Sequence, residues 1–126
     1  MNLINGYVYI PVSNFDMAAA WYKDILGFEL VFTDPIYYEL CSPSGIRIML
    51  IERRDGVNSH MMYDDSPQAS YGFTVDNIED IHKELTLKGL RPKEISTYQG
   101  KSFGFADLDG NVIELWEELK TEESNL

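Results

Sequence analysis

The sequence predicts an α+β fold of two βαβββ modules, whose strands form a cupped mixed sheet with the helices on the outer face. Three observations support this prediction: strand and helix patterns recur in the same order, residues recur at a constant spacing, and the strands alternate between an apolar and a mixed side. A chain of 126 residues is of the size of one domain. We therefore expect a single domain over 1–126, with module one at about 4–52, a linker at 53–68, module two at about 69–118 and a tail at 119–126.

The first half of the chain shows the element order most clearly. The run YVYIPV at 7–12 predicts a strand, and an apolar stripe at helical spacing predicts a helix over 13–28. Ser13 or Asn14 can cap the start of this helix, and Gly27 suits its end. Strands are expected at 28–33, 36–41 and 46–52, because turn-forming residues separate these runs.

The second half repeats this order after a polar linker. SYGFTV predicts a strand, and the helix that follows starts at Asp76 or Asn77 as cap and stops at Gly89. Three more strands are expected near 92–97, 101–106 and 111–118. The segment VSNFDMAAAW lies over VDNIEDIHKE at an offset of 63, and SPSGIRIMLIE lies over DLDGNVIELWE at an offset of 65. Such self-similarity indicates two copies of one supersecondary unit.

The strands have two different sides, because successive side chains of a strand point in opposite directions. One side is strongly apolar and is expected to pack under the helices; it comprises Val8, Ile10, Val12, Ile46, Ile48, Leu50, Tyr71, Phe73, Val75, Ile113 and Leu115. The other side mixes apolar and polar residues: Tyr7, Tyr9, Pro11, Arg47, Met49, Ile51, Ser70, Gly72, Thr74, Val112, Glu114 and Trp116. We interpret this mixed side as the lining of a cavity. The alternative is a sheet surface that faces solvent.

The charge and composition restrict the partners. The net charge of −11 argues against a nucleic-acid partner and favours a cationic small molecule, although acidity can also serve solubility alone. The single cysteine, Cys41, allows no intrachain disulfide. No apolar run is long enough to span a membrane, and the N-terminus has no signal-peptide pattern. We therefore expect a cytoplasmic protein without a membrane partner.

Three segments, YVYIPVSNFDMAAAWYKDILGFEL, YGFTVDNIEDIHKEL and FADLDGNVIELWE, resemble the glyoxalase/bleomycin-resistance/extradiol-dioxygenase superfamily, also called vicinal oxygen chelate proteins. The resemblance covers about residues 4–118. It implies two βαβββ modules that form a cupped sheet, often paired between the chains of a homodimer. Leu108 departs from the family pattern, which has proline at this place in the DLDG turn.

Metal-dependent members of this family hold a divalent ion in the cup. The resemblance places the ligand positions at Tyr7, Met49, Ser70 and Glu114, and only Glu114 keeps a ligand type of the family. One carboxylate, one thioether and two hydroxyls form a poor site for zinc, nickel or iron. We therefore expect no metal and no other cofactor. The alternative is an unusual metal site, such as Glu114 with His60.

The resemblance without the metal ligands favours a protein that binds a small molecule, of the drug- or metabolite-sequestering type, as a homodimer. The expected ligand-binding residues are Tyr7, Tyr9, Arg47, Met49, Ser70, Phe103, Glu114 and Trp116. Glu114 is also the candidate catalytic base, because the alternative function is a lyase, isomerase or dioxygenase of the same superfamily. Two further alternatives are open: Glu114 pairs with Arg47, or the cup is closed and serves association only.

Overall fold

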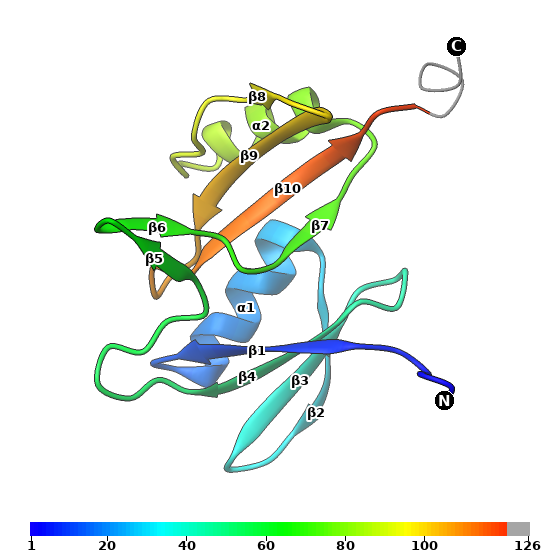
Figure 1. Ribbon diagram of the computed structural model, residues 1–126. Helices are drawn as coiled ribbons and strands as arrows, with labels where there is room; N and C mark the ends of the chain where they lie inside the picture. The colour runs from blue at the N-terminus through cyan, green and yellow to red at the C-terminus, as the bar shows by residue number, and fades with distance from the viewer. Residues whose placement is uncertain (121–126) are drawn as a thin grey trace. The chain divides into compact units, whose positions relative to one another are not determined.

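The computed structural model describes residues 1–120, and these form two compact units (Figure 1). Unit one contains residues 1–59 together with the turn Asp107–Asn111. Unit two contains, of the described residues, 60–106 and 112–120. The last part of the predicted tail, 121–126, lies outside the described residues.

Unit one has the element order that the sequence predicts. Its elements are β1 (Tyr7–Val12), α1 (Phe15–Leu26), β2 (Glu29–Thr33), β3 (Tyr37–Cys41) and β4 (Arg47–Glu52). The sheet order is β1-β4-β3-β2, with β1 parallel to β4 and the other neighbours antiparallel. A parallel pair requires a crossover connection, and α1 with the β2–β3 hairpin supplies it.

The helix α1 begins and ends where local chemistry permits. The side chain of Asn14 accepts a hydrogen bond from the Met17 amide at 2.9 Å, which satisfies one of the free amides of the first turn. Gly27 takes a left-handed conformation with φ of 77°, which a side chain would disfavour. Of the two predicted caps, Asn14 is therefore the one that acts.

The core of unit one lies between α1 and one face of its sheet. The side chains that fill it are less than 10% exposed: Ile10, Val12, Ala18, Ala19, Tyr22, Phe28, Leu40, Ile48 and Leu50. The strand members of this core alternate with exposed or half-buried residues along β4, as the apolar pattern predicts. The opposite face of this sheet carries the mixed side chains.

Unit two repeats the arrangement and adds a hairpin. Its elements are β5 (Met61–Tyr63), β6 (Ser66–Gln68), β7 (Gly72–Thr74), α2 (Ile78–Leu87), β8 (Ser96–Thr97), β9 (Gly100–Ala106) and β10 (Val112–Glu118). Four of these strands form a sheet in the order β7-β10-β9-β8, with β7 parallel to β10. β7 and β8 are shorter than the sequence predicts. The core contains Ile78, Leu85, Phe103, Phe105, Ile113 and Leu115.

The β5–β6 hairpin lies in the segment that the sequence analysis treats as a polar linker. Asp64 and Asp65 form its two-residue turn, with φ of 49° and 64°. Two left-handed residues in succession are typical of the tight turns that match strand twist. Asn-Gly is the common sequence for such a turn, so Asp-Asp gives only a weak signal. The two strands of three residues are also too short to show a clear alternation.

The start of α2 differs from the prediction of a local cap. Asn77 occupies the cap position, but its side chain makes no capping hydrogen bond. Instead, Glu117 of β10 accepts a hydrogen bond from the Ile78 amide at 3.0 Å. A carboxylate at this place also interacts favourably with the positive end of the helix dipole. The cap therefore comes from a residue 39 positions away in the chain, which local sequence cannot indicate.

A buried polar network holds the Asp107–Asn111 turn inside unit one. Asn111 is fully buried, and its side-chain amide donates hydrogen bonds to the Pro11 carbonyl and to Asp107, both at 2.9 Å. Its side-chain oxygen accepts from the Ser59 amide at 3.0 Å. Asp107 in turn accepts from the Tyr22 hydroxyl at 2.7 Å. Buried polar groups are costly unless they are paired, and this network pairs them.

We expect Asn111→Ala to lower the free energy of unfolding by about 2–4 kcal/mol, because it removes the side-chain hydrogen bonds to the buried Pro11 carbonyl, to buried Asp107 and to the half-buried Ser59 amide. Urea denaturation measures this loss. The exposed Asn2→Ala is the matched control and should change stability by less than about 0.5 kcal/mol. Equal stability of the two variants would show that the network contributes nothing.

We expect the double substitution Asp64→Asn with Asp65→Gly to stabilise the hairpin by about 0.5–1 kcal/mol, because both new residues favour the left-handed conformation. Hydrogen exchange of the amides in β5 and β6 should slow. The double alanine variant removes the same charges without this preference and should not slow exchange. If it slowed exchange equally, charge rather than backbone conformation would be the cause.

Candidate functional site

The exposed face of the unit one sheet gathers aromatic and apolar side chains from three adjacent strands. We call this surface the tyrosine face; it consists of Tyr7, Tyr9, Tyr37, Met49 and Ile51. The sheet register aligns Tyr9 with Met49 and Tyr37 with Ile51, which places these residues on one side. Together with Ile36, which lies next to β3, they line a cavity of about 440 Å³. Tyr7 and Tyr9 remain 51% and 56% exposed, so the cavity is accessible.

The phenol rings of Tyr7 and Tyr9 support each other. Their centroids lie 5.5 Å apart at an angle of 77°, an edge-to-face arrangement. A hydrogen bond with Tyr7 raises the pKa of Tyr9 above its usual value, so Tyr9 is neutral at physiological pH. The face therefore offers phenol hydroxyl groups and aromatic surfaces.

Arg47 borders the tyrosine face and already has a carboxylate partner in its own unit. Its Nε lies 2.9 Å from an oxygen of Glu39, and its Nη1 donates to Asn5 at 2.9 Å. The hydrogen bond with Glu39 raises the pKa of Arg47. The guanidinium also lies 5.7 Å from the centre of the Tyr7 ring, within cation–π range. The sequence analysis considers Glu114 as the partner of Arg47. In the structure, Arg47 is paired with Glu39 on the neighbouring strand β3.

Glu114 lies on the exposed side of the unit two sheet. It is opposite Gly72 of β7, and Trp116 is opposite Thr74. The glycine leaves the space beside the Glu114 backbone without a side chain, and Glu114 itself is exposed. Within the described residues of unit two, no hydrogen bond or ion pair engages its carboxylate. Trp116 is 36% exposed and donates its ring N–H to the Gln99 carbonyl at 3.2 Å.

Two other predicted site residues of unit two lie elsewhere. Phe103 is opposite Leu115, so it points to the side of the sheet that α2 covers, and it is only 3% exposed. Its ring centroid lies 4.8 Å from that of His82 on α2. Phe103 therefore belongs to the core under α2 and not to the face that carries Glu114, contrary to the prediction. Ser70 is exposed and precedes β7.

His60 is half-buried at the junction where β10 begins. Its Nδ1 accepts a hydrogen bond from the Val112 amide at 3.3 Å. An imidazole that accepts at Nδ1 carries its proton on the other nitrogen. His60 therefore has a structural contact that the linker interpretation missed.

The residues at the family's metal-ligand positions do not fit a metal. Met49 supplies a neutral thioether, and Tyr7 supplies a phenol that lies beside the Arg47 guanidinium. Divalent metal ions in proteins prefer carboxylate, imidazole or, for the softer metals, thiolate ligands, and neither Tyr7 nor Met49 supplies one of these. Ser70 and Glu114, at the other two positions, contribute one hydroxyl and one carboxylate. Within residues 1–120, no group of three His, Cys, Asp or Glu side chains is placed to hold a metal ion.

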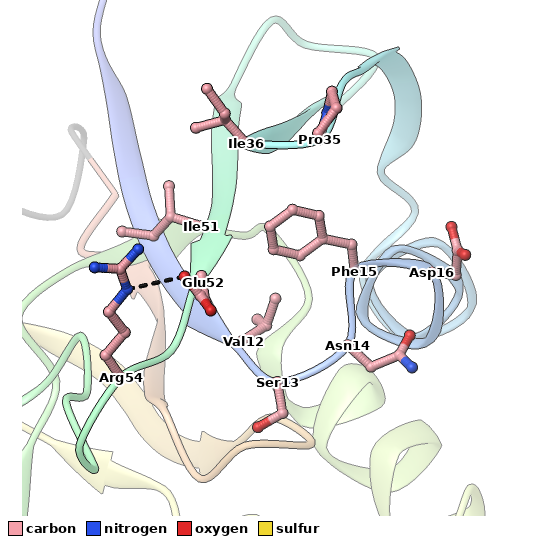
Figure 2. Close-up of a pocket in the computed structure, with 10 residues that line it drawn as sticks. All are labelled: Val12, Ser13, Asn14, Phe15, Asp16, Pro35, Ile36, Ile51, Glu52 and Arg54. Carbon is pink, nitrogen blue, oxygen red and sulfur yellow. Dashed lines mark hydrogen bonds and ion pairs between the residues drawn. The ribbon is translucent and has the colours of Figure 1, made fainter.

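A second cavity of unit one lies at the end of its sheet, and the sequence analysis missed it (Figure 2). It has a volume of about 740 Å³. Its walls come from the start of α1, the end of β4 and the turn between β2 and β3, including Phe15, Ile36, Glu52 and Arg54. Such a cavity forms only where these three segments meet, and no local pattern marks it.

The comparison of sequence families identifies the chain. The model of the Glyoxalase/Bleomycin resistance protein/Dioxygenase superfamily matches residues 4–115. The chain belongs to this superfamily. No match was found among curated proteins. No helix within residues 1–120 is long and apolar enough to cross a membrane.

Solved structures of superfamily proteins share the fold. TnmS3, an antibiotic binding protein from Streptomyces sp. CB03234, superposes with a TM-score of 0.77 at 18% identity, covering 94% of this chain and 99% of that one. The integron cassette protein HFX_CASS4, from the mobile metagenome of the Halifax Harbour sewage outfall, gives 0.69 at 26% identity, covering 89% and 97%. FosX, a fosfomycin resistance protein from Listeria monocytogenes in complex with Mn(II) and sulfate, gives 0.73 at 14% identity, covering 99% and 98%.

We expect Gly72→Ala to lower the free energy of unfolding by about 2–3 kcal/mol, because backbone or side chains must shift to accept the new methyl group. A Cβ at residue 72 would lie 2.5 Å from the Glu114 carbonyl oxygen. Thermal denaturation measures the loss. Gly6→Ala is the matched control, since a Cβ there meets no atom within 4 Å. An unchanged melting temperature for Gly72→Ala would show that β7 and β10 can separate freely.

Proposed function

We propose that this superfamily member binds a small aromatic cation on the tyrosine face and does so without a metal. One observation carries the proposal: an accessible cavity of about 440 Å³ lined by three tyrosines and three apolar side chains. Apolar cavities with a few polar groups are typical ligand sites. Aromatic faces attract flat molecules and cations in particular.

The electrostatics of the chain support a cationic ligand. The net charge of −11 attracts cations over long range. Arg47 is the positive group nearest Tyr7, and its ion pair with Glu39 offsets its charge locally. A guanidinium that is paired with a carboxylate therefore repels a cation bound at Tyr9 and Tyr37 less strongly than an unpaired guanidinium would.

The relatives support ligand binding. Whether a metal takes part is inferred from this chain's own residues. TnmS3 is an antibiotic binding protein, and FosX is a resistance protein whose complex contains Mn(II). The present chain lacks a suitable donor set at the metal positions, which favours the binding function. The alternative is an enzyme in which Glu114, exposed and unpaired within unit two, acts as a base. A homodimer and a cytoplasmic location stay predictions.

We expect a panel of flat aromatic amines to contain compounds that raise the melting temperature, with micromolar binding detected by fluorescence titration. Tyr9→Ala should weaken binding by about tenfold, because stacking on one ring contributes about 1–2 kcal/mol. Tyr98→Ala, at a side chain that is 81% exposed in unit two, is the control and should bind as the unchanged protein does. A panel without any melting shift would contradict the proposal.

We expect the purified protein to contain well below one equivalent of divalent metal and EDTA to leave ligand affinity unchanged. Elemental analysis and repeated titration measure both quantities. The reason is the donor set, in which only Glu114 is a good ligand for a divalent ion. One equivalent of metal that is lost in Glu114→Gln would overturn the metal-free proposal and favour the enzyme.

A further inference from the structure

The cavity at the end of the unit one sheet is continuous in its lining with the tyrosine face. Ile36 and Ile51 line both the cavity of about 440 Å³ and the cavity of about 740 Å³. Ile51 follows Leu50 on β4 and is opposite Tyr37, so it stands at the edge of the tyrosine face. Figure 2 shows Ile51, Ile36 and Phe15 around one space. A molecule on the tyrosine face can therefore extend over these side chains into the second cavity.

Ile36 is held in a defined position although it is 76% exposed. The side chain of Asp34 accepts hydrogen bonds from the amides of Ile36 at 2.8 Å and Tyr37 at 2.9 Å. Pro35 restricts the turn further. A large apolar side chain that is exposed on a preorganised backbone suits contact with a ligand, because little backbone entropy is lost on binding.

The lining of the second cavity includes a weakly held carboxylate, that of Glu52. Glu52 accepts a hydrogen bond from Arg54 Nε at 2.8 Å, and the two side chains are 65% and 77% exposed. Exposed ion pairs of this kind contribute little to stability, so a ligand amine can compete with Arg54 for Glu52. Asp16 adds a second negative charge to the lining. Its carboxylate accepts a hydrogen bond from Tyr38, so Glu52 is the better partner for a ligand.

We propose that the ligand is an elongated diamine, whose aromatic body lies on the tyrosine face and whose aliphatic arm crosses Ile36 and Ile51 to place an ammonium group at Glu52. This inference rests on the proposed function. Glu52 is the last residue of β4 and is in phase with Ile48 and Leu50, so its side chain lies on the α1 side of the sheet, and the arm reaches it around the strand end, where Ile36, Ile51 and Glu52 line one cavity. Because Glu52 follows Ile51 directly, an arm of about four methylene groups that passes Ile51 at the strand end places its terminal amine beside this carboxylate.

Quinacrine and its bare aminoacridine ring, which lacks the diamine arm, test the inference. We expect quinacrine to bind at least about tenfold more tightly than the bare ring, which corresponds to about 1.4 kcal/mol. Glu52→Gln should reduce the quinacrine affinity by about fivefold and leave the bare ring unaffected. Arg54→Ala should raise the quinacrine affinity about twofold, since it removes the competitor for Glu52.

Glu29→Gln is the matched control, because it removes the same charge at the opposite end of the sheet. It should leave the quinacrine affinity unchanged, which separates a local contact from the effect of net charge. Binding of both acridines with equal affinity, or equal losses in Glu52→Gln and Glu29→Gln, would overturn the inference and leave the proposed function standing. Absence of binding by either acridine would overturn both.

Discussion

The buried amide of Asn111 is the interaction on which unit one depends. Five residues of the β9–β10 turn, 107–111, complete a unit that is otherwise built from residues 1–59. Asn111 satisfies the Pro11 carbonyl at the end of β1, and Asp107 satisfies the Tyr22 hydroxyl in the core of α1. Since each group is buried, replacing one leaves its partners without hydrogen bonds. The DLDGN motif is therefore a structural element, and β10 with Glu114 begins directly after it.

The duplicated modules use the same frame for different surfaces. In the repeat, Tyr9 lies over Gly72 and Met49 lies over Glu114. Each pair is aligned within its own sheet by the same parallel strand pairing, Tyr9 with Met49 and Gly72 with Glu114. The first module has filled these positions with large apolar side chains. The second module has Gly72, which has no side chain, at one position and the carboxylate of Glu114 at the other. The exposed faces of the two sheets therefore differ in chemistry.

The proposed function depends on the tyrosine face and on the cavity at the end of the unit one sheet. Metal chemistry in this superfamily needs several good donors, and this chain keeps only Glu114 among them. Its two unit one cavities offer aromatic surface, phenol hydroxyl groups and the carboxylates of Asp16 and Glu52. Such groups suit the recognition of shape and positive charge, and this supports the proposed binding function. The same physical properties favour an elongated cation over a compact one.

Much of the fold could be predicted from the sequence because its signals are local. The local signals are the strand alternation, the apolar stripe of the helix, and the cap residues Asn14 and Gly27. The repeat indicates the same order of elements in both modules, and the structure has this order. The family resemblance supplied the positions of Glu114 and Met49. The β5–β6 hairpin escaped prediction, because its Asp-Asp turn and short strands carry only weak local signals.

The sequence by itself determined the modules, their helices and the two sides of each strand. Only the tertiary structure decided which polar groups meet. Strand register brings Glu39 to Arg47, places Glu117 at the start of α2 and turns Phe103 into the core. These contacts join residues that are far apart in the chain or on different strands, so no periodicity within one segment encodes them.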